Sequence, residues 1–114
     1  MLYIGFSTQT HRFYARILCR NFRHVAPVLV NKNKCIIYQF IAPNNISLIT
    51  IKRKDLKILQ KYGWKFVKYN GKFAPKHAIK TKPITCVQFT KRACRIKNIA
   101  IQTPDALFRY VNHK

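Results

Sequence analysis

The chain has 114 residues, of which 48% are hydrophobic and 13% aromatic. This is enough apolar material for one folded domain, so a disordered basic tail is excluded. The 23 Lys and Arg residues face only two acids, Asp55 and Asp105, which gives a formal net charge of +21. So few acids exclude paired-carboxylate glycoside hydrolysis, two-metal nuclease chemistry and calcium sites. Any enzyme made from this chain must therefore rely on other polar side chains.

The alternation of apolar residues predicts several strands. The segment 13–19 fits either a short helix or a strand. Pro27 lies inside the second predicted strand and favours an edge position or a bulge, because proline cannot donate to a strand ladder. The turn at residues 31–34 separates two apolar runs and predicts a hairpin. The predicted strands cover residues 1–7, 21–30, 35–42, 46–51 and 64–69.

A first helix is predicted over residues 52–62, with Leu56, Ile58 and Leu59 facing inward. Gly63 is expected to end this helix as its C-terminal cap. The residues from 72 to 82 are expected to form a basic loop.

A second helix is predicted from Cys86 to about Arg95. Thr85 is a suitable N-cap because its hydroxyl can accept a hydrogen bond from a free backbone N–H of the first turn. Apolar residues recur at helical spacing and indicate that one side of the helix faces a core. These apolar residues are Cys86, Phe89, Ala93 and Ile96.

The last part of the chain predicts a short apolar strand at residues 99–101 and a terminal helix. Thr103, Pro104 and Asp105 form a helix start, with a cap, a proline at the first helical position and an acid in the first turn. Together these elements predict an α+β fold, in which helices pack on an antiparallel sheet.

Cys86 is the candidate nucleophile. A thiol at a helix N-terminus feels the positive end of the helix dipole, which lowers thiol pKa values. Lys82, Lys91 and Arg92 are close in sequence and act in the same direction. The alternative is a buried structural cysteine, which is the commoner state of free cysteines.

His24 is the candidate base. Cysteine–histidine catalysis needs an imidazole near the thiolate and a polar group that orients the imidazole. His24 begins an apolar strand, and Gln39 in the neighbouring strand could accept its ring N–H. The alternative is a histidine at a strand edge near solvent, with the glutamine pointing outward. The other histidines, His11, His77 and His113, lie in predicted loops or near the C-terminus.

Several short motifs occur in a characteristic order along the chain. They are Gly5-Phe6-Ser7, Phe22-Arg23-His24-Val25, Ile37-Tyr38-Gln39, Thr85-Cys86-Val87 with Phe89, Lys91-Arg92, and Thr103-Pro104 with Leu107-Phe108-Arg109-Tyr110. This order resembles the circularly permuted papain-like (NlpC-like) cysteine peptidases and amidases. Within that group it is most similar to the short versions coded by tailed phages and by bacterial genomes that carry phage genes.

The resemblance implies a single permuted papain-like domain over residues 1–114. It implies a Cys86 nucleophile and a His24 base, with Gln39 where relatives often carry a glutamate. It further implies an acyl-enzyme mechanism on an amide or acyl substrate such as a peptidoglycan peptide, without a metal or cofactor. Relatives commonly have a glycine after the cysteine helix, and Asn98 is the residue expected to supply that left-handed conformation here.

The alternative function is nucleic-acid binding, or a virion-associated role on a non-catalytic scaffold. The charge implies a polyanionic partner, and the candidates are a cell-wall polymer, nucleic acid and an anionic membrane surface, with phage virion proteins as further candidate partners. A solvated basic face whose aromatic residues point into the core is the simpler explanation of the same pattern. The candidate phosphate-binding residues are interleaved with aromatic ones and are Lys52, Arg53, Lys54, Lys57, Lys61, Lys65 and Lys68.

The cysteine pattern bears on metals and on cellular location. No Cys-x-x-Cys or His-x₃₋₅-His pair is present, so a zinc module is not expected. The first residues lack the features of a signal peptide, and no apolar run approaches the ~20 residues of a membrane span. A cytoplasmic or virion-associated protein with reduced thiols is therefore expected.

Overall fold

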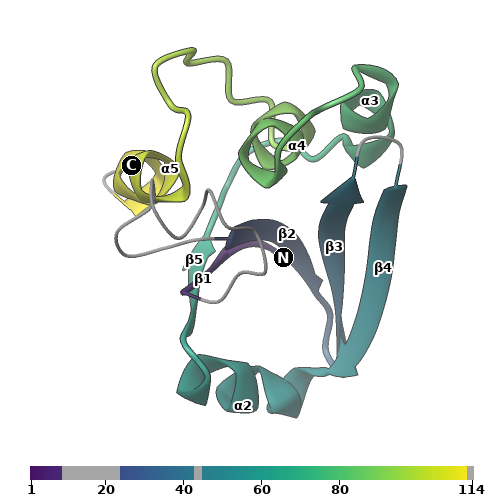
Figure 1. The fold of residues 1–114 in the computed structure, drawn as a ribbon. Coiled ribbons are helices and arrows are strands. Elements are labelled where there is room, and N and C mark those ends of the chain that lie inside the picture. The colour runs from purple at the N-terminus through teal and green to yellow at the C-terminus, as the bar shows by residue number, and fades with distance from the viewer. Residues whose placement is uncertain (9–23, 43–44, 113–114) are drawn as a thin grey trace.

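The computed structural model describes residues 1–8, 24–42 and 45–112. Within these residues, five strands form one antiparallel sheet in the order β4-β3-β2-β1-β5, with helices on both of its faces (Figure 1). The predicted α+β class is thus confirmed. The predicted segment 13–19 and the first residues of the second predicted strand lie outside the described residues.

The boundaries of the five strands agree closely with the pattern of apolar residues in the sequence, whereas the helix predicted over residues 52–62 is a 3₁₀ turn followed by a shorter α-helix. The strands are β1 (Leu2–Ser7), β2 (His24–Val30), β3 (Lys34–Ala42), β4 (Asn45–Lys52) and β5 (Trp64–Lys68). The helical elements are the 3₁₀ turn η1 (Arg53–Asp55) and the helices α2 (Leu56–Lys61), α3 (Pro75–Lys80), α4 (Cys86–Ala93) and α5 (Pro104–Asn112). In the described part of the chain, no helix has the length and apolar character needed to span a membrane.

The two faces of the sheet cover two different cores. On one face, here called the α4 face, the fully buried Ile4, Phe6 and Val25 pack beneath α4 and α5. On the other, here called the α2 face, Ala26 and Val28 pack with partly buried residues of α2. Figure 1 shows α4 and α5 on one side of the sheet and α2 on the other.

Local sequence explains where α4 begins and ends. The hydroxyl of Thr85 caps its start by accepting from the Gln88 N–H at 3.1 Å. Its end is closed by two backbone bonds, from Ile96 N to Lys91 O at 2.8 Å and from Arg95 N to Arg92 O at 3.3 Å. This is the Schellman arrangement, and it requires a left-handed residue at Arg95, whose φ is 60°.

The left-handed residue after α4 was expected at Asn98, and this expectation is wrong. Arg95 takes the left-handed conformation, because it directly follows the last residue that caps the helix. Asn98 instead uses its side-chain oxygen, which accepts from the backbone N–H of Ala100 at 3.0 Å. The segment 99–101 forms a turn and an irregular stretch, so the short strand predicted there is also wrong.

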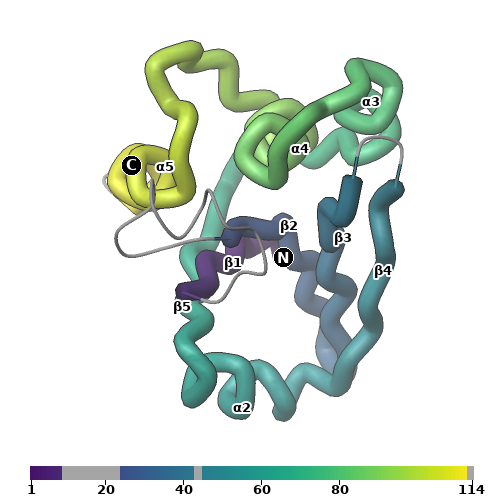
Figure 2. Tube along the Cα trace, viewed as in Figure 1, coloured from purple at the N-terminus to yellow at the C-terminus, as the bar shows by residue number. Residues whose placement is uncertain are grey.

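The start of α5 confirms the predicted capping signal. Thr103 accepts from the N–H of Ala106 at 3.1 Å, and Pro104 is the first helical residue. The connection from α4 arches away from the sheet before α5 returns to it (Figure 2). Leu107 is then fully buried, and Phe108 meets the ring of Phe6 edge-on with centroids 5.2 Å apart.

Pro27 occupies a central strand, contrary to the prediction of an edge strand or a bulge. It pairs with Ile4 of β1, while the ladder between β2 and β3 begins only at Val28, opposite Ile37. The proline therefore lies where β2 has no ladder partner on the β3 side. Its missing N–H costs little there, because no bond to β3 is lost.

Two smaller expectations also need correction. The basic loop predicted at residues 72–82 contains α3, because Pro75 starts a helix and Ala78 is buried against α4. Ile58 of α2 is 51% exposed, whereas Leu56 and Leu59 pack against the core as predicted. Because α2 has fewer than two turns, only one side of it contacts the core.

Gly63 follows α2 with φ of 96°, which confirms the expected C-terminal cap.

Replacing Leu107 by Ala is expected to lower the free energy of unfolding by about 2–5 kcal/mol, because it leaves a cavity beneath α5. Urea denaturation followed by circular dichroism measures this change. Ile99→Ala is the control, since Ile99 is 84% exposed and its truncation should change stability by less than about 0.5 kcal/mol. Equal effects of the two substitutions would contradict the packing described for α5.

Candidate functional site

Cys86 is the first residue of α4 and is partly exposed. Its side chain packs against buried residues of the α4 face. Thr85 caps this helix by accepting from the Gln88 N–H, so Cys86 lies in the first turn, where backbone N–H groups have no partner within the helix. The predicted position of this cysteine at a helix N-terminus is therefore confirmed.

His24 is the first residue of β2 and is half-buried. The register pairs Ser7 with His24 on one side and with Trp64 on the other, so these three side chains share one face. The imidazole meets the indole of Trp64 edge-on, with ring centroids 6.1 Å apart. Because Trp64 packs with Ala26 and Val28, this is the α2 face.

The sheet lies between the two residues of the predicted catalytic pair. Val25 faces α4, and its neighbour His24 points to the opposite side because successive strand residues alternate. Cys86 packs on the side of Val25. This arrangement does not bring thiol and imidazole together, and the catalytic roles of both residues stay predictions.

Gln39, the predicted orienting residue, lies in β3 opposite Ser47 of β4 and is half-buried. It alternates with Ile37, so it belongs to the α2 face, the same face as His24. However, the ladder between β2 and β3 ends at the pair of Val28 and Ile37. Gln39 is therefore beyond the paired part of the two strands, and its proximity to His24 also stays a prediction.

The other described thiols are buried. Cys94 is fully buried, and burial raises the pKa of its thiol to about 12. Burial also raises the pKa of the Cys35 thiol, although the charge of Arg53 opposes this effect. Cys19 lies outside the described residues. Among the three described cysteines, Cys86 is thus the one with an accessible side chain.

A basic hollow of about 530 Å³ lies beside the turn between β2 and β3. A backbone bond from Arg53 N to Asn33 O, 3.0 Å long, ties η1 to this turn. As a result, residues that are twenty positions apart in the sequence line one surface, here called the hairpin cluster. Its members are Lys32, Asn33, Lys52, Arg53, Lys54 and Lys57.

The remaining predicted phosphate-binding residues lie elsewhere. The Nζ of Lys65 lies 5.1 Å from the centre of the Phe108 ring, next to α5. Lys68 is exposed at the end of β5, and Lys61 is exposed at the end of α2. The predicted set thus divides, and its first four members alone meet in the hairpin cluster.

The aromatic residues near this basic region mostly face the core. Trp64 and Phe66 stack on each other with centroids 5.8 Å apart and an angle of 11° between the rings. Both pack on the α2 face. Tyr62, by contrast, is 69% exposed. Alternation along β5 therefore turns Trp64 and Phe66 toward the α2 face, in agreement with the simpler explanation of the pattern.

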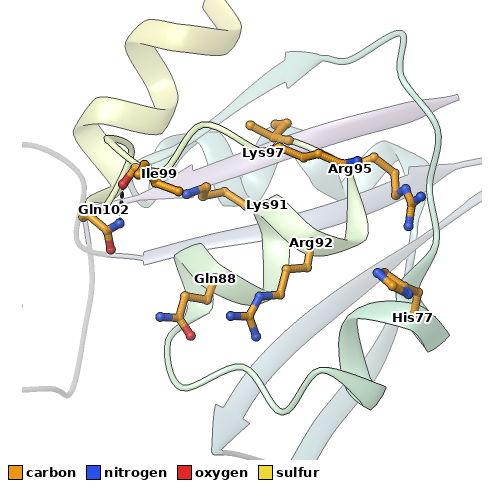
Figure 3. Close-up of a pocket in the computed structure, with 9 residues that line it drawn as sticks. His77, Gln88, Lys91, Arg92, Arg95, Lys97, Ile99 and Gln102 are labelled. Carbon is orange, nitrogen blue, oxygen red and sulfur yellow. Dashed lines mark hydrogen bonds between the residues drawn. The ribbon is translucent and has the colours of Figure 1, made fainter.

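A second basic hollow, of about 350 Å³, was not predicted from the sequence (Figure 3). It lies between α3, α4 and the connection to α5, and is here called the α4–α5 pocket. Its basic residues follow each other closely in the sequence after Cys86. The lining residues are His77, Gln88, Lys91, Arg92, Arg95, Ile96, Lys97, Ile99 and Gln102.

Metal binding has no support in the described ranges. Among residues 1–8, 24–42 and 45–112, no three His, Cys, Asp or Glu side chains lie close enough together to hold a metal ion. Within these ranges, the structure offers instead one accessible thiol, that of Cys86, and the two basic hollows.

In the folded protein, iodoacetamide is expected to label Cys86 at least about tenfold faster than Cys35 or Cys94. The physical reason is that the latter two thiols are buried and have raised pKa values. Mass spectrometry of peptides after brief labelling measures the three rates. Labelling in denaturant provides the control, because all thiols should then react at similar rates. Fast labelling of Cys94 in the native protein would contradict the described burial.

Comparison with protein-family models, with curated proteins and with solved structures finds no match for this chain. Its function therefore has to be inferred from the positions and charges of its own side chains.

Proposed function

We propose that the protein binds a polyanion, with nucleic acid as the favoured class, through the hairpin cluster. The observation that supports this most directly is the convergence of Lys32 with Lys52, Arg53, Lys54 and Lys57 on one hollow. No acid lines that hollow. Residues from two separate segments are needed to form it, so it is a feature of the fold and not merely of a basic stretch of chain.

The energetics favour binding of a phosphate backbone at this surface. The side chains of Lys52, Arg53, Lys54 and Lys57 are exposed, so little desolvation is required before they meet an anion. Each lysine or arginine that neutralises a phosphate releases condensed counterions, which is the main driving force of non-specific binding. Asp55, the nearest acid in sequence, opposes only part of this charge.

The same surface predicts weak sequence preference. Lysine side chains contact phosphates as point charges and do not read base edges. The nearby rings of Trp64 and Phe66 are packed into the core and cannot stack on several bases in a row. Binding is therefore expected to depend on charge and on salt, and to vary little among oligonucleotides of equal length.

The substitution of Lys52, Arg53, Lys54 and Lys57 by Gln should weaken binding of a single-stranded oligonucleotide. If each residue neutralises one phosphate, the slope of log K against log salt should lose about 3 units. Fluorescence anisotropy over a series of salt concentrations measures that slope. Cys86→Ala should leave both affinity and slope unchanged.

A matched control removes four charges elsewhere. Lys72, Lys76, Lys80 and Lys82 are exposed residues on and around α3, and their replacement by Gln changes the net charge equally. This control should alter the slope much less than the hairpin-cluster variant. If the two variants behave alike, diffuse charge and not the hairpin cluster is responsible for binding.

A second candidate function is a cysteine-dependent hydrolase that acts on an amide or acyl substrate such as a peptidoglycan peptide. The observation that favours it is the accessible thiol of Cys86 at the capped N-terminus of α4. In this mechanism, the thiolate attacks the carbonyl carbon, and the leaving amine or alkoxide takes a proton from the His24 imidazolium as the acyl-enzyme forms. Backbone N–H groups of the first turn stabilise the oxyanion, and water then releases the acyl group.

The role of His24 separates the two candidate functions. If His24 is the base of a hydrolase, His24→Ala should abolish iodoacetamide labelling of Cys86 at pH values below the ordinary thiol pKa of about 8.5. The same substitution should also abolish hydrolysis of peptidoglycan peptides. If the two residues stay on opposite faces of the sheet, His24→Ala should leave the pH profile of labelling unchanged. Circular dichroism of both variants establishes that the fold survives. An unchanged profile combined with absent hydrolysis rejects the hydrolase.

A further inference from the structure

The α4–α5 pocket differs from the hairpin cluster because it contains a buried cation. Lys91 is only 9% exposed, and its ammonium donates to the carbonyl of Ile101 at 2.8 Å. A buried charge is costly unless an opposite charge accompanies it. Neither Asp55 nor Asp105 lines this pocket. Burial, and then the neighbouring charge of Arg92, lower the pKa of Lys91, as expected for a cation without a counterion.

Two other polar groups of the pocket, those of Arg92 and Gln88, are held in position by the protein. The guanidinium of Arg92 donates to both the carbonyl and the hydroxyl oxygen of Thr81, each at 3.1 Å. The side-chain oxygen of Gln88 accepts from the N–H of Ile84 at 2.9 Å, which leaves its amide N–H groups available as donors. Fixed donors lose little conformational entropy when an anion arrives.

The backbone carbonyls at the C-terminal end of α4 do not compete with an anion for the hydrogen-bond donors of the pocket. The carbonyls of Lys91 and Arg92 accept bonds from Ile96 and Arg95, so these acceptors of the last turn are already satisfied. The positive side chains therefore remain the dominant charges of the pocket. Figure 3 shows Arg95 directed toward His77 of α3, while Lys91 extends toward Ile99 and Gln102.

Arg95 is an unfavourable residue for its backbone conformation. Its φ of 60° lies in the left-handed region, where glycine is the residue that stability favours. An arginine at this position brings a guanidinium to the pocket at some cost in stability. The same conformation occurs at Lys82, with φ of 53°, but Lys82 does not line the pocket.

We propose that the α4–α5 pocket binds a phosphate group through Lys91, Arg92, Arg95 and Lys97. Several cations around one hollow fit an anion with more than one negative charge, and planar guanidinium groups match the spacing of phosphate oxygens. The hollow of about 350 Å³ lies in the size range of small-ligand sites. Ile96 and Ile99 provide an apolar wall for an organic part of the ligand. This site is separate from the hairpin cluster and does not depend on the function proposed for it.

The test uses inorganic phosphate as the probe and compares two glycine substitutions in the full chain. Arg95→Gly and Lys82→Gly each remove one positive charge and place glycine where the backbone is left-handed. Both substitutions should therefore raise the melting temperature in chloride. Phosphate at millimolar concentration, with ionic strength held constant, should raise the melting temperature of the parent protein by about 5 °C. Lys82→Gly should retain this increase, and Arg95→Gly should lose most of it.

Two further measurements keep the result unambiguous. The side-chain amide resonance of Gln88 should shift on titration with phosphate, and this shift should be lost in Arg95→Gly. Lys52→Gln combined with Arg53→Gln should retain the phosphate effect, since these residues belong to the hairpin cluster. Equal loss of the increase in Arg95→Gly and Lys82→Gly, or no increase in the parent protein, would overturn the proposal.

The source of the phosphate group is then assigned by competition. An oligonucleotide without a terminal phosphate should displace inorganic phosphate from the Gln88 resonance if the pocket takes an internal phosphodiester. If displacement requires a terminal phosphate or a free phosphate monoester, the pocket takes the doubly charged group. If neither compound displaces inorganic phosphate, and if sulfate and phosphate shift the Gln88 resonance equally, the pocket has no preference for phosphate and the proposal is overturned.

Discussion

The antiparallel register of β1 with β2 and β5 determines which side chains reach each face of the sheet. Ile4 and Phe6 go beneath α4 and α5, while Gly5 turns toward the opposite core. A Cβ at Gly5 would lie 3.0 Å from ring atoms of both Phe66 and Trp64, so glycine lets these rings close over the strand. A shift of one residue would exchange the two cores, which is why such a register is strongly specified.

The same register governs the chemistry of the predicted pair. His24 and Val25 are adjacent in sequence, yet they point to opposite faces. Cys86 shares its face with Val25 and not with His24. Local signals correctly placed the thiol at a helix N-terminus, because a capping threonine acts within one turn. The position of the Cys86 thiol relative to the His24 imidazole depends on how the strands pair. No residue near Cys86 in the sequence takes part in that pairing.

Positive charge is the other property that the structure has to accommodate. Most lysines and arginines stay exposed, where water screens their mutual repulsion, and Lys91 is the buried exception among the described residues. Two sets of these cations meet in hollows without acids. The anions that would balance them have to come from outside the chain. This links the composition to the proposed binding of polyanions and of phosphate.

The sequence by itself determined the five strands of the sheet, the hairpin turn, the caps at Thr85 and Thr103 and the end of the first helix at Gly63, because each depends on residues a few positions apart. It also determined the sign of the charge and the scarcity of acids. Only the tertiary structure placed Pro27 in a central strand and gathered the α4–α5 pocket from α3, α4 and the chain leading to α5. Those outcomes depend on which segments pack together, and packing between distant segments leaves no local pattern in the sequence.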